Sequence, residues 1–255
     1  AEHKKIPLEN VKVTLEHSRV HAEDCKTCET EDGRIDRIDK TIDLSGDLDE
    51  AQWRALAELV AARGLVPFVD FAYQGFGEGL EEDARGLRII ADAVPELFIA
   101  SSCSKNFGLY RERTGALTVV ASNAEQAATA HSQLCNVARG MWSMPPDHGA
   151  AVVAGILSSV ELRPRWEQEV SAMRSRINSL RVQLVERLAA AGAGDYSFIA
   201  RERGMFSFLG VSAPQVAQLA ADYSIYLVDS SRINVAGLNR SNIDYVAEAI
   251  AAVTA

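Results

Sequence analysis

The chain has 255 residues, and its content of 47% hydrophobic and 24% charged residues is that of a globular protein of one or two domains. A net charge of -9 argues against a nucleic-acid-binding face, which needs clustered cations, and four cysteines are too few for a disulfide scaffold. The apolar runs fall short of the roughly 18 residues of a membrane helix, and the first ten residues lack the apolar core of a secretory signal, so we expect a cytoplasmic protein with no membrane partner.

Residues 1–45 are rich in charged residues and threonine, and their composition and pattern differ from those of the rest of the chain. Apolar residues alternate with polar ones from 11 to 15 and, more loosely, from 35 to 42. This alternation predicts two short strands joined by a polar segment, with a turn at Asp32-Gly33.

Cys25 and Cys28 lie in that polar segment, shortly after His17 and His21. The spacing allows a zinc site, but a solvated acidic loop is the favoured interpretation, so we assign no metal. The stretch from 15 to 52 resembles the middle of OsmC-like peroxide-reductase domains. Since the reactive cysteines of that family lie before and after this stretch, Cys25 and Cys28 take no catalytic role from the resemblance. Residues 1–45 are therefore expected to be an OsmC-like β fragment, fused to the remainder of the chain.

The pattern changes to a helix near residue 48. Asp47 or Asp49 is placed to cap this helix, Gly64 to end it, and one face carries four apolar residues, Trp53, Leu56, Leu59 and Val60. The next run, LVPFVDFAY, is nearly continuous in apolar residues, as in a strand covered on both faces.

Strands and helices then alternate. Residues 83–94 predict a helix, and 96–102 and 115–121 predict strands, which together indicate an α/β fold with a mostly parallel sheet. Helical pattern dominates from 123 to 191, with a break at Met144-Pro145-Pro146, and Cys135 is expected to face the core from this region. A smaller α+β part comes last, made of FSFLG, a helix near 214–223, IYLVD, RINVAG and a final helix from Asn239.

The strongest local signal is the segment from 101 to 115, where Lys105 comes after a buried strand on a loop of small residues. A lysine held in an apolar site has a lowered pKa and can form a Schiff base. Small hydroxyl side chains and an arginine nearby would suit a phosphate. From the residues alone, an exposed loop lysine remains the alternative, and Cys103 is expected to be a small filler rather than a nucleophile.

The stretch SxSKNFGLYxERxG, residues 102–115, resembles the lysine motif of the class I aspartate and aromatic amino-acid aminotransferases. The resemblance implies that Lys105 binds pyridoxal 5'-phosphate (PLP) and moves the substrate proton, and that Ser102 and Arg113 bind the cofactor phosphate. The upstream stretch VDFAYQGF is similar to the same family. It implies that Asp70 pairs with the pyridine nitrogen of PLP, which lets the ring accept electrons, and that Tyr73 donates a hydrogen bond to its O3′ atom.

Two further stretches resemble substrate-binding motifs of this family. SRINVAGL implies that Arg232 binds the substrate α-carboxylate, for which a planar guanidinium is suited, and RGMFSF implies that Phe206 lines the pocket. The stretch VARGMWSMPPDHGA implies that Arg139 binds a side-chain carboxylate across a homodimer, with Ser143 near the interface. Met141, Trp142 and Met144 replace more polar residues there, which favours aromatic substrates.

The resemblance covers residues 46–255 and about half of such an enzyme. It implies a partial large domain of the PLP fold type I at 46–162 and a small C-terminal α+β domain at 163–255. The expected function is transfer of an amino group between an aromatic or dicarboxylic amino acid and a 2-oxo acid. An inactive chimeric fragment and, from the N-terminal resemblance, a thiol peroxide reductase are the alternatives.

Overall fold

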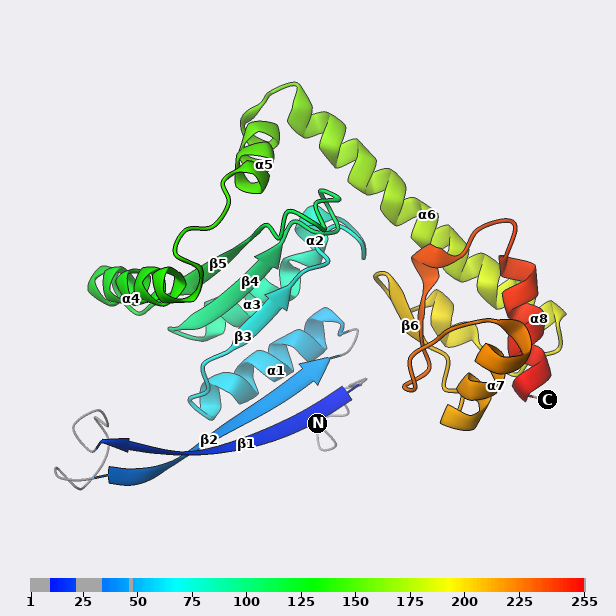
Figure 1. Ribbon diagram of the computed structural model, residues 1–255, viewed down its shortest axis with the longest axis horizontal. Coiled ribbons are helices and arrows are strands. Elements are labelled where there is room, and N and C mark those ends of the chain that lie inside the picture. Colours follow the sequence, from blue (N-terminus) through cyan, green and yellow to red (C-terminus); the bar gives the residue numbers. More distant parts are fainter. Residues whose placement is uncertain (1–9, 22–33, 46–47, 255) are drawn as a thin grey trace. The chain divides into compact units, whose positions relative to one another are not determined.

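The computed structural model describes residues 10–21, 34–45 and 48–254, and the chain divides into two compact units, Ala1–Ala55 and Leu56–Ala255 (Figure 1). In the first unit, β1 (Asn10–His21) and β2 (Arg34–Ser45) form an antiparallel pair, from Asn10 opposite Ser45 to His21 opposite Arg34. The two predicted strands are confirmed and are longer than expected. The predicted turn at Asp32-Gly33 and the two cysteines of the candidate zinc site lie outside the described residues.

Helix α1 (Glu50–Ala62) begins where its capping residues predict. The Gln52 backbone N–H donates to Asp49 Oδ1 and the Asp49 N–H donates to Gln52 Oε1, both at 2.8 Å, which satisfies two of the free donors of a helix N-terminus. The helix ends before Gly64, whose φ of 59° is in the left-handed region. Ala57 is buried in this helix, whereas Leu59, expected on the covered face, is 36% exposed.

A three-stranded sheet in the order β3-β4-β5 lies in the second unit, formed by Phe68–Phe71, Leu97–Ser102 and Gly115–Val120. Strands β3 and β4 are parallel, and the connection between them contains α2 (Leu80–Asp83) and α3 (Arg85–Ala93). Strand β5 is antiparallel to β4. The expectation of a mostly parallel sheet is therefore wrong for β5, because the segment between β4 and β5 is a loop without the crossover helix that a parallel return needs.

The prediction that the run LVPFVDFAY is covered on both faces is also wrong. Strand β3 contains only Phe68–Phe71, and the Phe68 side chain is 65% exposed. In the described sheet β3 pairs with β4 on one side only, which places it at an edge, and the exposure of Phe68 shows that one face of this strand is not covered by another layer of the described chain.

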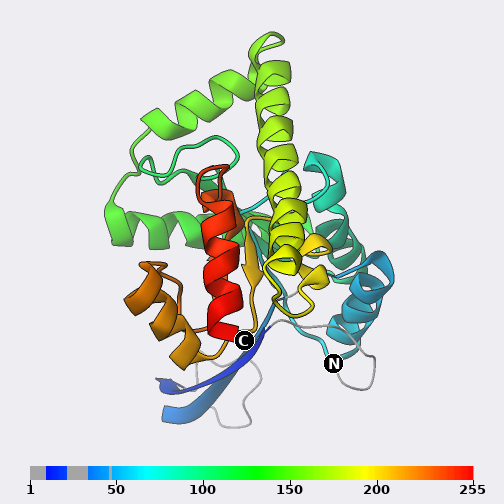
Figure 2. The same cartoon turned by 90° about the vertical axis from the view of Figure 1, so that its right-hand side faces the viewer.

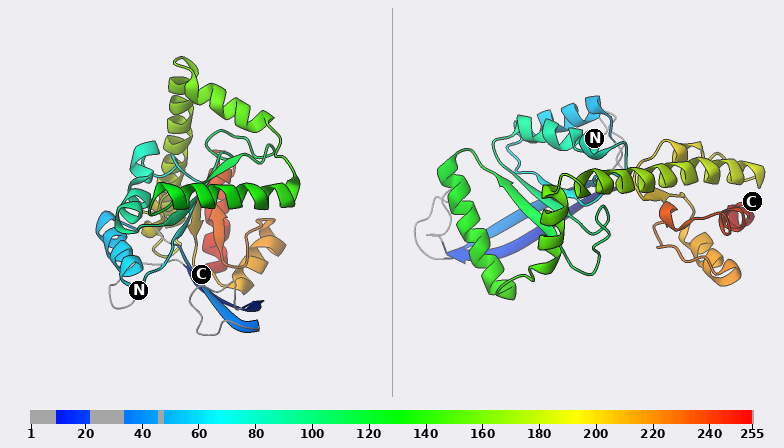
Figure 3. Two further views of the ribbon diagram at one scale, coloured as in Figure 1. Left: turned by 90° about the vertical axis from the view of Figure 1, so that its left-hand side faces the viewer. Right: turned by 90° about the horizontal axis from the view of Figure 1, so that it is seen from above.

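Three successive helices connect β5 to the C-terminal segment, namely α4 (Ala124–Trp142), α5 (His148–Ser158) and α6 (Leu162–Ala190). The predicted break at Met144-Pro145-Pro146 separates α4 from α5. Helix α4 lies against β5 (Figure 3) and buries none of its residues. Cys135 is consequently exposed, so its expected place in the core is wrong, because no described element covers α4 closely enough to bury its side chains.

The C-terminal segment packs on the second half of α6. It contains two short helices, two strands and two longer helices, which are η3 (Ser197–Ala200), β6 (Phe206–Phe208), α7 (Ala213–Tyr223), β7 (Arg232–Asn234), η4 (Val235–Gly237) and α8 (Ile243–Thr254). Helices α6 and α8 run side by side (Figure 2). The IYLVD stretch, residues 225–229, contains no helix or strand. No helix within the described residues has the length and apolar character needed to cross a membrane.

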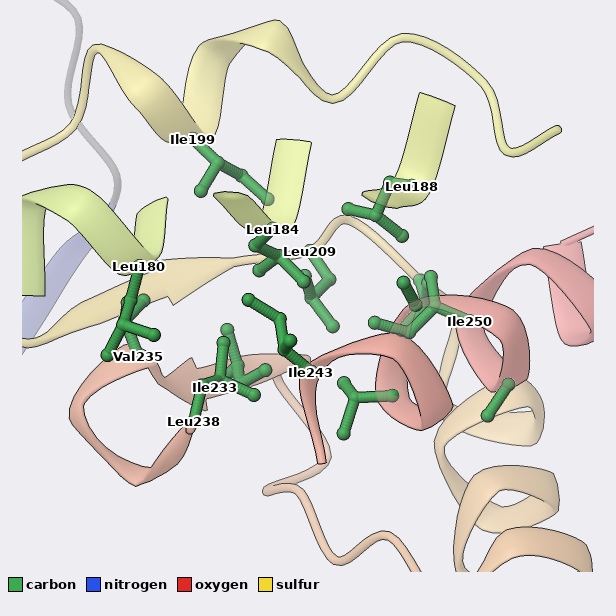
Figure 4. Packing of buried hydrophobic residues seen from close by; sticks show 14 of the residues in the cluster. Leu180, Leu184, Leu188, Ile199, Leu209, Ile233, Val235, Leu238, Ile243 and Ile250 are labelled. Carbon is green, nitrogen blue, oxygen red and sulfur yellow. The ribbon is translucent and has the colours of Figure 1, made fainter. Parts of the chain in front are cut away.

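A hydrophobic core fills the space between these C-terminal elements (Figure 4). Leu184 and Leu188 of α6, Ile250 of α8 and Ile199 of η3 are fully buried in it, and Ile233 of β7 is almost so. Burial of each of these side chains contributes about 1.5–3 kcal/mol of transfer free energy. This core fixes the position of β6 and β7 and, with them, of two residues expected in the site.

Candidate functional site

The loop that carries Lys105 is closed at its base by the β4–β5 pair. Gly115, the first residue of β5, is opposite Ser102, the last residue of β4, and the Cys103 N–H donates to the Thr114 carbonyl at 3.0 Å. A Cβ on Gly115 would lie 2.4 Å from the Ser101 carbonyl oxygen, so the two strands approach too closely for a side chain there. The closure brings Ser102 and Arg113, the two residues expected to bind phosphate, to the same end of the sheet.

Polar contacts order the base of this loop. The Ser104 N–H donates to Ser102 Oγ at 3.2 Å, and the Ser102 hydroxyl lies 3.0 Å from Ser104 Oγ. Arg113 adopts a φ of 51°, and its Nη1 donates to the Tyr110 carbonyl at 3.0 Å while the guanidinium stays exposed. A non-glycine residue in the left-handed region is uncommon and marks a position that its surroundings hold in place.

The two residues that follow Lys105, Asn106 and Phe107, anchor the loop to the segment after β3 and to α6. The buried Asn106 donates through Nδ2 to the Gln74 carbonyl at 3.4 Å and accepts from Trp166 Nε1 at its own carbonyl at 2.8 Å. The Phe107 ring stacks on the Trp166 ring, with centroids 4.4 Å apart and planes inclined by 12°. Lys105 therefore sits on a loop that is fixed both to the sheet and to α6.

Cys103 is partly buried next to this lysine. Burial raises the pKa of the Cys103 thiol above its ordinary value of 9.0, because desolvation disfavours the thiolate. A thiol that stays protonated is a weak nucleophile, which is consistent with the small packing role expected from the sequence.

Asp70 lies near the carboxyl end of β3, opposite Ala100 of β4. Strands β3 and β4 are parallel, so Asp70, Tyr73 and Ser102 all lie at the carboxyl ends of the strands. Open α/β sheets bind their ligands at this end. Asp70 is exposed there, with its carboxylate free to meet a ligand from solvent.

A row of ring contacts joins four of the expected site residues. Lys105 Nζ lies 4.3 Å from the centroid of the Tyr73 ring. The Tyr73 ring meets the Phe206 ring edge to face, with centroids 5.8 Å apart and an angle of 84°. Arg232 Cζ in turn lies 4.6 Å from the centroid of the Phe206 ring. An amine and a guanidinium are thus connected by two aromatic rings that come from different segments of the chain.

The antiparallel pairing of β6 and β7 determines how Phe206 and Arg232 lie relative to each other. Phe206 is opposite Asn234, and Phe208 is opposite Arg232, so Phe206 and Arg232 are diagonal neighbours in a two-stranded sheet, within reach of a long side chain.

Arg181, on α6, was not expected from the sequence. It is 1% exposed and donates to the carbonyls of Phe206 and Gly204, the latter at 2.8 Å, and to the Ser207 hydroxyl. The sequence contains a signal that could have found it, because Arg181 falls on the apolar stripe of Ile177, Leu184 and Leu188.

Arg139 stands apart from this row. It lies on α4 with its guanidinium exposed, and within the described residues its hydrogen bond is local, from Nη1 to the Ser143 carbonyl at 3.5 Å. Ser143 caps α4 with a φ of 64°. The side chains of Met141, Trp142 and Met144 around it are more than half exposed. The structure brings Lys105, Tyr73, Phe206 and Arg232 together and leaves Arg139 outside the group.

Comparison with known proteins identifies the family. The family model described as "Aminotransferase class I and II" matches residues 45–250. The chain belongs to this family. The aromatic-amino-acid aminotransferase of Pseudomonas aeruginosa is 52% identical over 210 residues, which are 82% of this chain and 53% of that protein. An aspartate aminotransferase of the same organism is 47% identical over 205 residues, 80% of this chain and 52% of the other.

Solved aminotransferase structures show the same fold. The aromatic-amino-acid aminotransferase of Burkholderia pseudomallei, covalently bound to pyridoxal phosphate, has a TM-score of 0.79 and 51% identity over 82% of this chain and 53% of its own. The chain therefore spans about half the length of the aminotransferases it matches, and its α/β fold is part of the PLP-dependent fold type I. Residues 1–44 precede the family match.

Proposed function

We propose that this chain carries the Lys105 half of a PLP-dependent aminotransferase site, which moves an amino group between an aromatic or dicarboxylic amino acid and a 2-oxo acid. The observation that carries the proposal is the row of contacts from Lys105 through Tyr73 and Phe206 to Arg232. This series of contacts begins with a primary amine and ends with a guanidinium, a group that suits a carboxylate, and two rings connect them.

The side chains at the edge of the sheet fit PLP by their chemistry. Lys105 offers the amine that bonds the cofactor aldehyde, and Asp70 a carboxylate for the pyridine nitrogen. Ser102, at the end of β4, and Arg113, two residues before β5, offer a hydroxyl and a guanidinium for the phosphate. When bound, PLP supplies an aromatic ring that withdraws electrons from the substrate.

The protein's own residues supply positioning and proton transfer. Lys105 Nζ takes and returns the proton of the substrate Cα, since it is an amine on a loop that is anchored on both sides. Arg232 holds the α-carboxylate through two parallel hydrogen bonds, and its contact with the Phe206 ring orients the guanidinium plane. Tyr73 would donate a hydrogen bond to the O3′ atom of PLP, and its ring contacts Lys105.

Substrate choice and assembly extend this proposal. Arg139 is exposed on α4 and binds a side-chain carboxylate in the site of a second subunit, next to Ser143, which makes the working unit a homodimer. The exposed Met141, Trp142 and Met144 form a weakly polar mouth that suits aromatic substrates. We also propose a cytoplasmic location, as the sequence indicates.

The proposed domain limits are 46–162 for the partial large domain and 163–255 for the small C-terminal domain. The packing of the C-terminal elements on the second half of α6 supports the second of these. An OsmC-like origin remains our proposal for residues 1–45, whose two described strands pair with each other and overlap the family match only at Ser45.

An absorbance titration with PLP tests the function. We expect a visible band that requires Lys105, is absent in Lys105→Ala, and bleaches when aspartate or phenylalanine is added. The relative rates with the two amino acids report the substrate class. If no Lys105-dependent band forms, the chain is an inactive fragment, which is the alternative favoured by its matching only half of each relative.

A further inference from the structure

The loop after Tyr73 is unusually glycine-rich. Residues 74–79, which we call the 74–79 loop, read Gln-Gly-Phe-Gly-Glu-Gly and connect β3 to α2. Three glycines in six residues would make an isolated segment costly to order, because glycine loses more conformational freedom than any other residue. In the structure Gly75, Phe76 and Gly79 are nevertheless buried. Something outside the loop's own side chains must therefore hold it.

Asp83, in the last position of α2, is the group that holds it. Its Oδ2 accepts from the N–H groups of Gly75 at 2.8 Å and Gly77 at 3.0 Å, and its Oδ1 from those of Glu78 at 2.8 Å and Gly79 at 3.4 Å. Four donors converge on one half-buried carboxylate. An ionised carboxylate has acceptor sites for all four and no donor to oppose them.

The glycines of the loop leave the space that Asp83 and α6 occupy. A Cβ on Gly77 would lie 2.6 Å from Asp83 Oδ1, and on Gly75, whose φ is 95°, 2.7 Å from a methyl carbon of Val170. Side chains at these positions would displace either the carboxylate or α6. The loop thus leaves room for Asp83 on one side and for a helix on the other.

The far side of the loop is bound to the segment that carries Phe206. The Gly75 carbonyl accepts from Arg174 Nη1 at 3.2 Å, and the Gly77 carbonyl from Asn178 Nδ2 at 3.3 Å, both donors being on α6. Glu78 forms an ion pair with Arg203, three residues before Phe206, at 2.7 Å. The loop therefore contacts α6 and the segment before Phe206, and through the Gln74 carbonyl it also contacts Asn106, the residue after Lys105.

We propose that Asp83 is a positioning residue for Tyr73, and that it fixes the Tyr73 ring between Lys105 and Phe206 by ordering the 74–79 loop. The loop passes this order on to Tyr73, because the Tyr73 carbonyl accepts the Phe76 N–H at 3.2 Å and Tyr73 immediately precedes the loop in the sequence. The consequence for PLP binding rests on the proposed function, whereas the consequence for the Tyr73 ring does not.

The variant Asp83→Asn tests this. It keeps the size of the side chain, but an amide has one oxygen and turns an NH2 group toward backbone donors. Asp92→Asn, at an exposed position on α3, is the matched control. We expect amide hydrogen exchange in residues 75–79 to quicken about tenfold in Asp83→Asn, as loss of charged hydrogen bonds predicts, and to stay at the wild-type rate in Asp92→Asn.

The position of the Tyr73 ring is measured separately by fluorine NMR of protein labelled with 3-fluorotyrosine, with the Tyr73 signal assigned by Tyr73→Phe. We expect this signal to shift or broaden in Asp83→Asn while that of Tyr196 holds. A second variant, Gly77→Ala, displaces the same carboxylate without removing its charge and should give the same result, against Gly194→Ala, whose added methyl meets open space.

Titration with PLP completes the test. The Lys105-dependent band should require several times more PLP in Asp83→Asn than in Asp92→Asn. An unchanged Tyr73 signal in a variant whose 74–79 loop exchanges faster would overturn the proposal, as would an unchanged exchange rate. If the wild-type chain forms no band, the proposed function fails, and the fluorine signal and the exchange rates still decide the role of Asp83.

Discussion

Lys105 Nζ lies 4.3 Å from the centre of the Tyr73 ring, and that ring meets Phe206 edge to face. Through these two contacts, the Tyr73 side chain connects the loop that carries Lys105 to the β6–β7 pair. Aromatic pairs of this geometry contribute about 0.5–1.5 kcal/mol beyond the area they bury. The coupling between these residues can be measured in the free protein, without cofactor or substrate.

A double-mutant cycle of Tyr73→Ala and Phe206→Ala should therefore give a coupling free energy of about 1 kcal/mol in urea unfolding. The control cycle pairs Phe206→Ala with Tyr110→Ala, a half-exposed ring of the lysine loop, and should give a coupling near zero. Equal coupling in the two cycles would show that Tyr73 and Phe206 do not interact in solution.

Replacement of Arg181 by Met should destabilise the protein by about 3–5 kcal/mol, because the carbonyls and the hydroxyl that accept from its buried guanidinium lose their donor. Arg187→Met on the same helix is the control. Arg187 forms an ion pair with Asp244 at 2.7 Å in which both side chains are at least half exposed, so its loss should cost at most about 1 kcal/mol. Urea unfolding measures both, and similar losses would contradict the assignment of Arg181 to the core.

Two glycine-to-alanine changes should have opposite signs. Gly115→Ala brings a methyl group against the Ser101 carbonyl, a backbone atom that cannot turn away, and should destabilise by about 1–3 kcal/mol. Gly155→Ala lies in the middle of α5 with open space around its new methyl group, and should stabilise by about 0.5–1 kcal/mol through helix propensity. Thermal unfolding distinguishes them, and a stabilising Gly115→Ala would mean that β4 and β5 are further apart than described.

The two described cysteines should differ in reactivity. Cys135 is exposed on α4, whereas burial raises the pKa of Cys103, so iodoacetamide at pH 8 should modify Cys103 about tenfold more slowly. Mass spectrometry of the peptides gives both rates, and faster reaction at Cys103 would contradict its burial.

The same burial predicts a pH dependence of stability. Because the folded state keeps the Cys103 proton to a higher pH than the unfolded state, this contribution is fully present below the ordinary thiol pKa of 9.0 and is lost as the pH rises through the raised value. Unfolding free energies should therefore fall less steeply between pH 8 and 10 in Cys103→Ala than in the wild type. Parallel slopes would contradict the prediction.

Local signals predicted most element boundaries well. The break after α4 comes from two prolines, and the start of α1 from the reciprocal bonds of Asp49 and Gln52. The lysine motif pointed to Lys105 and the residues around it, because many fixed residues at fixed spacing leave little room for chance. The contact of Lys105 with Tyr73 could not be predicted in this way, since it depends on how β3 and β4 pair.

Some features escaped prediction because the periodicity of the sequence does not report them. The direction of β5 is set by a loop without a helix, which alternation of strands and helices does not reveal. Cys135 was expected in the core because it lies on one face of a predicted helix, yet α4 has no face that the rest of the described chain buries. Arg181 was hidden by the general rule that charged residues are exposed, a rule that fails where many carbonyls converge.

Helix α6 makes contacts with distant segments at successive turns along its length. Arg174 and Asn178 bind the 74–79 loop, and Arg181 binds the segment that leads into β6. Each residue added to an α-helix turns everything beyond it by about 100°. A one-residue insertion between Asn178 and Arg181 would therefore swing the guanidinium out of the core while the loop contacts stayed in place. The same insertion beside Gly194, in the loop after α6, would be absorbed by flexible backbone, so length variation among natural variants of this chain should be confined to such loops and excluded from the middle of α6.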